Sequence, residues 1–299
     1  MLPIAYHPIY KYPLPEGHRF PMIKYELLPQ QLLHEGTVTE SDFHAPGLPE
    51  MQHILAVHDR QYVDSLLNLT LDARAVRKIG FPLSAELTER ELRITQGTIW
   101  GCGQALQYGI AFNIAGGTHH AYSTRGEAFC LLNDQAIGAK YLLDNKLAQK
   151  VLIVDLDVHQ GNGTAEIFVG NNAVFTFSMH GKSNYPFKKE TSDQDIALPD
   201  NTGDEEYLSI LRATLPKLID EQKPDFIFYL SGVDILASDK LGKLCIIAGC
   251  RERDKFVLSL CQKLNIPVQC SMGGGYSPEI KTIIEAHANT YRVAKEIFT

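Results

Sequence analysis

Short, continuously apolar runs recur along this chain, and polar or glycine-rich sequence follows most of them. Six runs lie at 3–6, 110–114, 151–154, 173–177, 226–230 and 266–270. Because these runs do not alternate apolar and polar residues, they are typical of strands buried on both faces, as in a parallel sheet. Helix-like segments lie at about 21–35, 60–69, 88–108, 134–147, 204–220, 252–264 and 278–297. This alternation predicts an α/β fold with helices on both faces of the sheet.

The sequence that follows these strands carries many reactive side chains. The segments GGTHH, DLDVH, SMH, SGVD and SMGGGY each follow a predicted strand. In an open parallel sheet, the carboxyl ends of the strands form the ligand crevice. We therefore expect residues from five distant stretches to meet in one site.

Composition limits the class of protein. The 299 residues show no repeat, low-complexity linker or composition break, which predicts a single domain over 1–299. A net charge of −7 without any basic run argues against nucleic-acid binding. No apolar run approaches the roughly 18 residues that span a membrane, and the first residues lack the features of a signal peptide. The six cysteines form no C-x-x-C pair, so we expect reduced thiols and a cytoplasmic location.

The strongest local signal is the segment DLDVHQGNG at 155–163. In an extended chain, residues two apart point the same way, so Asp157 and His159 are able to present a carboxylate and an imidazole together. These groups suit zinc, and a catalytic zinc site uses three protein ligands. Asp234, in a small-residue turn after another predicted strand, is the natural third ligand. Helix capping by one such residue is common, but three together favour a metal site.

Two further groups suit proton transfer and oxyanion stabilisation. His119 and His120 follow a Gly-Gly turn, and histidine titrates near neutral pH, as a general acid–base requires. Asp155 and Asn162 flank the metal motif and are placed to orient the two rings. Tyr276 ends a glycine turn, and its phenol is a neutral hydrogen-bond donor at pH 7 that is suited to a developing oxyanion.

Taken together, these segments resemble the histone deacetylase family, and most closely its class IV branch and bacterial relatives. The resemblance runs from GHRF at 17–20 to GY at 275–276, through GGTHHAYSTRGEAFCLLND at 116–134, VDLDVHQGNGTAEIF at 154–168 and LSGVDILASDKLGKL at 230–244. It implies a three-layer arginase–deacetylase fold with a mainly parallel eight-stranded sheet. It also implies a zinc-dependent hydrolase (with ferrous iron as an alternative metal) that removes acetyl or longer acyl groups from lysine side chains of proteins or peptides.

The resemblance also implies roles for individual residues. Zinc would be held by Asp157, His159 and Asp234, with His119 paired to Asp155, His120 paired to Asn162, and Tyr276 as the oxyanion donor. The substrate channel would be formed by Phe129, Tyr185, Leu241 and Gly274. A structural potassium ion would be held by the segments at Asp155, Asp157, His159, Ser178 and Met179.

The chain departs from the commoner family pattern at two positions. Position 162 is Asn where most relatives outside this branch have Asp, so the pKa of His120 should be lower than beside a carboxylate. Position 160 is Gln where many relatives have a second histidine. Neither departure removes a predicted zinc ligand.

Three other functions remain open. The same chemistry would serve an acetylated polyamine or another acylated small amine. A ureohydrolase on the same fold uses two manganese ions, but its late strand requires Asp-x-Asp, whereas this chain has Val233-Asp234-Ile235. A catalytically silent module that binds acyl-lysine is the third, although binding alone would not require His119, His120 and Tyr276.

Overall fold

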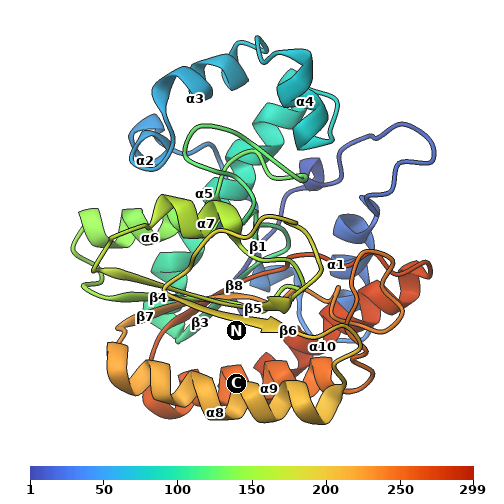
Figure 1. The fold of residues 1–299 in the computed structure, drawn as a ribbon, viewed down its shortest axis with the longest axis vertical. Helices are drawn as coiled ribbons and strands as arrows, with labels where there is room; N and C mark the ends of the chain where they lie inside the picture. The colour runs from blue at the N-terminus through green and yellow to red at the C-terminus, as the bar shows by residue number, and fades with distance from the viewer.

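The computed structural model describes all 299 residues, and an eight-stranded sheet lies at its centre (Figure 1). The strands are β1 (Ile4–Ala5), β2 (Phe43–His44), β3 (Ile110–Asn113), β4 (Val151–Asp155), β5 (Val174–Gly181), β6 (Gln194–Leu198), β7 (Phe226–Leu230) and β8 (Val268–Ser271). Their spatial order is β2-β1-β3-β8-β7-β4-β5-β6, and every neighbouring pair is parallel. The predicted parallel eight-stranded sheet is confirmed.

Helices cover both faces of the sheet, which gives three layers. They are α1 (Lys24–His34), α2 (Met51–Leu55), α3 (Arg60–Leu67), α4 (Ala73–Ile79), α5 (Ala85–Tyr108), α6 (Asp134–Asp144), α7 (Asn162–Ile167), α8 (Asp204–Gln222), α9 (Gly249–Leu264) and α10 (Ile280–Phe298). In Figure 1, α6 and α7 lie over one face, and α8, α9 and α10 lie over the other. No helix combines the length and the apolar character required to cross a membrane.

The central strands are buried on both faces, as their continuous apolar sequence predicts. In β4, Leu152 and Val154 belong to a large core cluster, whereas Val151 and Ile153 belong to a second, smaller one. Alternate side chains of a strand point to opposite faces, so each cluster fills one side of the sheet. The strand is therefore apolar at its first four positions and becomes polar only at Asp155, its last residue.

Five strands and helices were not predicted from the sequence. The missed strands are β2, which has only two residues, and β6, an edge strand with one buried residue out of five. The missed helices α2, α4 and α7 have five, seven and six residues. The helix α7 begins at Asn162, inside the segment DLDVHQGNG at 155–163, and follows the end of β4 at Asp155 after a short turn.

The strand order places the predicted site residues close together. Strand β8 is last in the sequence but lies between β3 and β7, and β7 pairs with β4. At the carboxyl ends, Asp155 is the register partner of Leu230, and Leu230 is the partner of Ser271. The segments that follow β4, β7 and β8 therefore leave the sheet side by side.

Candidate active site

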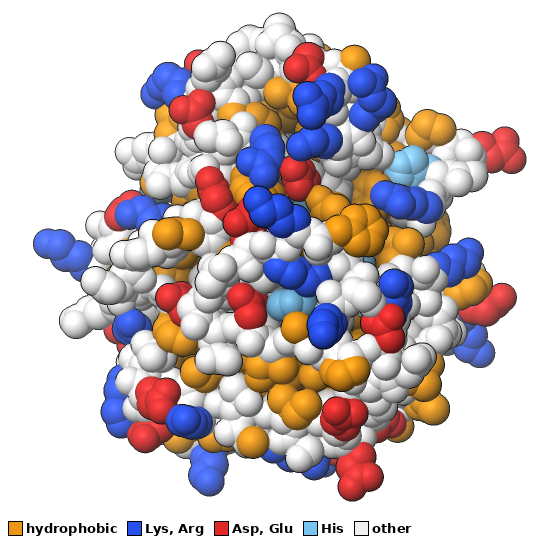
Figure 2. Space-filling view, in the orientation of Figure 1, with side chains coloured by type: hydrophobic (Ala, Val, Ile, Leu, Met, Phe, Trp, Pro, Cys, Tyr) orange, Lys and Arg blue, Asp and Glu red, His pale blue; other side chains and the backbone are white.

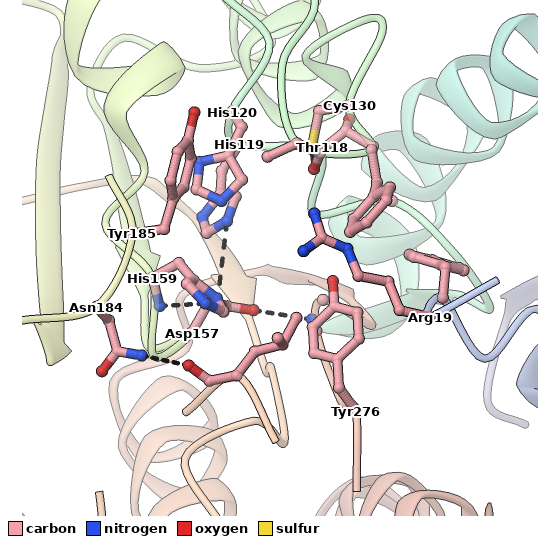
Figure 3. A pocket seen from close by; sticks show the side chains of 18 of the residues that line it. Arg19, Thr118, His119, His120, Cys130, Asp157, His159, Asn184, Tyr185 and Tyr276 are labelled. Atoms are coloured by element: carbon pink, nitrogen blue, oxygen red, sulfur yellow. Dashed lines mark hydrogen bonds and ion pairs between the residues drawn. The ribbon is translucent and has the colours of Figure 1, made fainter. Parts of the chain in front are cut away.

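A cavity of about 490 Å³ opens at the carboxyl ends of the central strands, and 25 residues line it. Nine residues predicted from the sequence share this lining: His119, His120, Phe129, Asp157, His159, Tyr185, Leu241, Gly274 and Tyr276. Figure 3 shows His119 and His120 close to Asp157 and His159, with Tyr276 across the cavity from them. Asp155, Asn162 and Asp234 are buried behind the lining. Four of the five predicted stretches therefore meet at this site, whereas Ser178, Met179 and His180 do not line the cavity.

Asp157, His159 and Asp234 form a compact buried cluster, called here the acidic group. His159 Nδ1 lies 3.0 Å from Asp157 Oδ1 and 3.1 Å from Asp234 Oδ2. One ligand atom from each residue lies within 4.8 Å of the others. The exposed fractions of the three residues are 2%, 8% and 0%. This group could hold a metal ion at the base of the cavity.

The charges in this group strongly perturb one another. Burial and the neighbouring Asp157 carboxylate raise the pKa of Asp234 to about 7. Burial lowers the pKa of His159, but hydrogen bonds to Asp157 and Asp234 outweigh it and raise the pKa to about 10. Metal ligands bind in their deprotonated forms, so protons and a metal ion compete for these atoms.

Two glycines lie directly against the carboxylates of the acidic group, so closely that any side chain at either position would collide with the carboxylate oxygens. A Cβ atom at Gly274 would lie 2.0 Å from Asp234 Oδ2 and 2.8 Å from Asp157 Oδ2. A Cβ atom at Gly232 would lie 2.3 Å from Asp157 Oδ2. The Gly274 N–H also donates to Asp157 Oδ2 over 2.8 Å. The acidic group offers one imidazole nitrogen and carboxylate oxygens, and the glycines leave their ligand atoms unobstructed. This set of donors fits zinc, which takes nitrogen and oxygen ligands.

His119 is paired with a carboxylate. Its Nδ1 lies 2.7 Å from Asp155 Oδ2, and its Nε2 lies 3.9 Å from Asp157 Oδ1. Burial lowers the pKa of His119, but the Asp155 carboxylate outweighs burial and raises the pKa above its ordinary value. His119 therefore favours the protonated state.

His120 is paired with an amide instead. Its Nδ1 lies 2.6 Å from Asn162 Oδ1, while Asn162 Nδ2 donates to the Tyr122 hydroxyl over 2.9 Å. The Tyr122 hydroxyl in turn donates to Glu190 Oε1 over 3.2 Å. This chain aims the amide oxygen at His120, so Nδ1 carries the proton and Nε2 is left free to accept one. Burial and the cationic neighbours His119 and His159 lower the pKa of His120 well below its ordinary value.

Tyr276 lies on the opposite side of the cavity from the histidine pair. Its hydroxyl points into the cavity in Figure 3, and its ring centroid lies 6.4 Å from that of His159. Its backbone N–H donates to Asp239 Oδ2 over 2.6 Å, which fixes the turn after the glycines. Burial and the carboxylates of Asp234 and Asp157 raise the pKa of Tyr276 well above its ordinary value, so the phenol keeps its proton.

Phe129 and Tyr185 form aromatic walls of the cavity, with Leu241 and Gly274 in the same lining. The backbone of Phe129 is left-handed, with φ of 70°, which is unusual for a bulky residue. Its N–H donates to Ile79 O over 2.6 Å, so the end of α4 holds this conformation. The Tyr185 hydroxyl donates to Glu127 Oε2 over 2.8 Å. Both walls are therefore fixed by contacts outside the cavity.

The potassium site stays a prediction. Asp155 and Ser178 are register partners on β4 and β5, so the expected segments are adjacent. The Ser178 hydroxyl lies 3.0 Å from His180 Nδ1, and Met179 is buried.

Two buried cations near the site were not predicted. Lys24 is fully buried, and its Nζ donates to Gly273 O over 3.1 Å, next to the predicted oxyanion donor. Arg253 is also fully buried, and its guanidinium donates to the carbonyls of Leu156, Ser231 and Gly232, which adjoin the acidic group. Both lie in segments predicted to be helical, and a cationic side chain on a helix normally faces solvent, so the sequence carried no signal for either.

Comparison with known proteins agrees with this geometry. The family model described as "Histone deacetylase domain" matches residues 18–291. An uncharacterized protein from Picosynechococcus is 44% identical over 297 residues, which is 99% of each chain. Histone deacetylase 2 from Arabidopsis thaliana is 29% identical over 277 residues, 89% of this chain and 72% of that protein. The acetoin utilization protein AcuC from Staphylococcus aureus is 27% identical over 291 residues, 89% of this chain and 75% of that protein.

The fold is also shared with a solved structure. The crystal structure of the HDA15 HD domain has a TM-score of 0.82 at 18% sequence identity, and the match covers 99% of this chain and 88% of that one. The parallel eight-stranded sheet between helical layers is therefore an arginase–deacetylase fold. Within that fold, the chain belongs to the histone deacetylase family, and this membership supports a deacetylase activity.

Proposed function

We propose that this protein is a zinc-dependent deacylase that hydrolyses the amide bond of acyl-lysine in proteins or peptides. The observation that carries the proposal is one cavity lined by a buried Asp–His–Asp group, a histidine pair and a tyrosine hydroxyl. A metal ligand set, proton-transfer groups and an oxyanion donor are the parts that amide hydrolysis requires. A module that only binds acyl-lysine would not need all three.

Zinc held by Asp157, His159 and Asp234 would polarise the amide carbonyl and lower the pKa of a water molecule. His120 is the group best suited to accept the proton of that water, because its Nε2 is free and its lowered pKa keeps it neutral at pH 7. His119, paired with Asp155, favours a positive charge beside the reacting centre. The Tyr276 hydroxyl would donate to the developing oxyanion, and the returning proton would come from His120 to the lysine amine.

The cavity walls fit a long, thin amine substituent. Phe129 and Tyr185 present aromatic surface in the lining that they share with the acidic group, as the methylene stem of a lysine requires. The same lining includes Ile94 and Gly116, an apolar side chain and a residue without one, which suit the acyl group.

The test is hydrolysis of three substrates by protein of known metal content: an acetyl-lysine peptide, a long-chain acyl-lysine peptide and an acetylated polyamine. We expect turnover of an acyl-lysine peptide that requires added zinc and is lost in Asp157→Ala. Reconstitution with ferrous iron in place of zinc identifies the more active metal. Bound zinc with no turnover of any substrate would overturn the proposal, and turnover of the polyamine alone would move the activity to small amines.

A further inference from the structure

The mouth of the cavity is basic, although the chain as a whole has a net charge of −7. Four of the 25 lining residues are cationic: Arg19, Lys78, Arg90 and Lys243. The only carboxylate in the lining is Asp157, which belongs to the acidic group. Arg90 is buried and paired with Glu91, so it contributes no net charge. Three exposed cations therefore remain, from three separate segments of the chain.

Arg19 has no partner of its own in the protein. Its guanidinium carbon lies 5.0 Å from the centroid of the Phe129 ring, and it forms no ion pair and no hydrogen bond. In Figure 3, the Arg19 side chain reaches into the cavity on the same side as Tyr276. Stacking on the aromatic wall holds the guanidinium at the mouth and leaves its N–H groups free to bind a carboxylate.

Lys78 and Lys243 are only partly neutralised by neighbouring groups. Lys78 Nζ lies 3.2 Å from Glu127 Oε1, but Arg125 Nε lies 3.0 Å from the same oxygen, so two cations share one carboxylate. Lys243 Nζ lies 3.4 Å from the Ser183 hydroxyl, which donates to Asp200. Lys243 itself has no ion pair.

Figure 2 shows Lys and Arg side chains, with Asp and Glu side chains among them, beside hydrophobic ones in the middle of the face below α3 and α4. One hydrophobic side chain at the mouth is Phe187, which is 90% exposed and lies edge-on to Tyr185. Exposed aromatic surface beside Arg19 and Lys243, which have no ion pair, suits a chain that extends out of the cavity. A compact polycation would meet like charges there, which disfavours an acetylated polyamine.

We propose that Arg19, Lys78 and Lys243 select acyl-lysine substrates with acidic side chains next to the modified lysine. The inference rests on the proposed function and names its substrate class: an acyl-lysine peptide with Asp or Glu at the neighbouring positions. Because these three cations lie at the mouth, they should affect substrate affinity and the rate of association more than the rate of the chemical step. The same three cations would also attract the α-carboxylate of free Nε-acetyl-lysine, which is therefore the alternative substrate.

The test compares acetyl-lysine peptides that differ only in their flanking residues: Asp, Gln or Lys. We expect kcat/KM to be about tenfold higher for the Asp peptide than for the Gln peptide, and lower again for the Lys peptide, with the change mainly in KM. The differences should shrink at high salt, because exposed charges are screened. Free Nε-acetyl-lysine and its C-terminal amide complete the panel. A lower KM for the free amino acid than for the Asp peptide would overturn the assignment to peptides.

The variants Arg19→Gln and Lys243→Gln should each reduce the ratio of Asp-peptide to Gln-peptide kcat/KM several-fold. Lys217→Gln is the matched control, since it removes an exposed lysine of α8 outside the cavity and should leave the ratio unchanged. Equal kcat/KM for all three peptides, or a ratio that survives in Arg19→Gln and Lys243→Gln, would refute the inference.

A binding measurement separates this inference from the proposed activity. Fluorescently labelled Asp and Lys peptides are titrated with the zinc-loaded protein at low salt. Tighter binding of the Asp peptide, lost in Arg19→Gln, supports the basic mouth even if no peptide is hydrolysed. Equal binding of both peptides by an active enzyme overturns the inference and leaves the deacylase proposal standing.

Discussion

His120 Nδ1 and Asn162 Oδ1 lie 2.6 Å apart, so the imidazole beside the acidic group is oriented by a neutral amide, whereas His119 is oriented by the carboxylate of Asp155. The two adjacent rings, whose centroids are 4.1 Å apart, therefore differ in their preferred charge. The pKa of His119 is raised and that of His120 is lowered. Such a divergence supports the proposal that His120 is the base.

The variant Asn162→Asp should move the acid limb of the pH–rate profile to higher pH. A carboxylate beside His120 stabilises the imidazolium and raises its pKa, so the neutral base is lost at a higher pH than in the wild type. We expect a shift of about one pH unit or more in kcat/KM, measured from about pH 5 to 9. The control is Asn145→Asp, an exposed position at the end of α6. An acid limb that does not move would show that His120 is not the titrating base.

The variant Tyr276→Phe should lower kcat by roughly 10²–10³ with a small change in KM, because the hydroxyl acts on the oxyanion that forms only in the transition state. Steady-state kinetics at equal zinc content measure this. Tyr291→Phe removes the hydroxyl of another buried tyrosine, outside the cavity, and should retain activity. A near-wild-type rate in Tyr276→Phe would contradict the donor role.

Zinc affinity should rise with pH. Metal binding must displace the proton that His159 carries below a pKa of about 10, so the affinity should increase about tenfold per pH unit above pH 7. Below pH 7, Asp234 is also protonated, with a pKa of about 7, and the dependence should become steeper. Chelator competition at pH 6, 7 and 8 measures this. An affinity that stays constant over this range would contradict the perturbed pKa values.

The variant Gly274→Ala should weaken zinc binding by roughly 10–100-fold, because its methyl group would press on both carboxylates of the acidic group. Zinc content after dialysis and the rise in Tm on adding zinc report this without any activity assay. Gly103→Ala on α5 is the control, since nothing lies within 4 Å of its added Cβ. Equal zinc content in both variants would show that the clearance at Gly274 is not needed.

Strands and helices could be predicted from the sequence wherever the pattern of apolar residues matches the faces that are buried in the structure. Strand β7 and the first four residues of β4 are apolar because both faces are covered, and the predicted bounds of the two strands agree with the structure to within one residue. The bounds of β6 were not predictable, because an edge strand such as Gln194–Leu198 needs little apolar sequence. Helix α5 begins earlier than predicted, since the Ser84 hydroxyl accepts from Leu87 N and caps the first turn.

The site was predictable where residues follow a strand directly, as Asp157 and His159 do. The contacts that hold these residues were not, because they depend on tertiary packing. The left-handed backbone of Phe129 depends on the end of α4, and the buried Lys24 depends on a carbonyl 249 residues away. The basic mouth could not be predicted from a chain of acidic composition either, since Arg19 and Lys243 come together only through loops that are far apart in the sequence.

The position of β8 between β3 and β7 has a consequence for biosynthesis. During synthesis, the first 267 residues leave β3 and β7 as two open sheet edges, with no strand to join the two halves. Only when Val268–Ser271 has emerged do both edges close, and the Gly273–Tyr276 turn arrives with it. A ribosome-bound fragment that ends before this strand should therefore have neither a complete sheet nor a finished pocket, and its exposed edges would need protection from other chains.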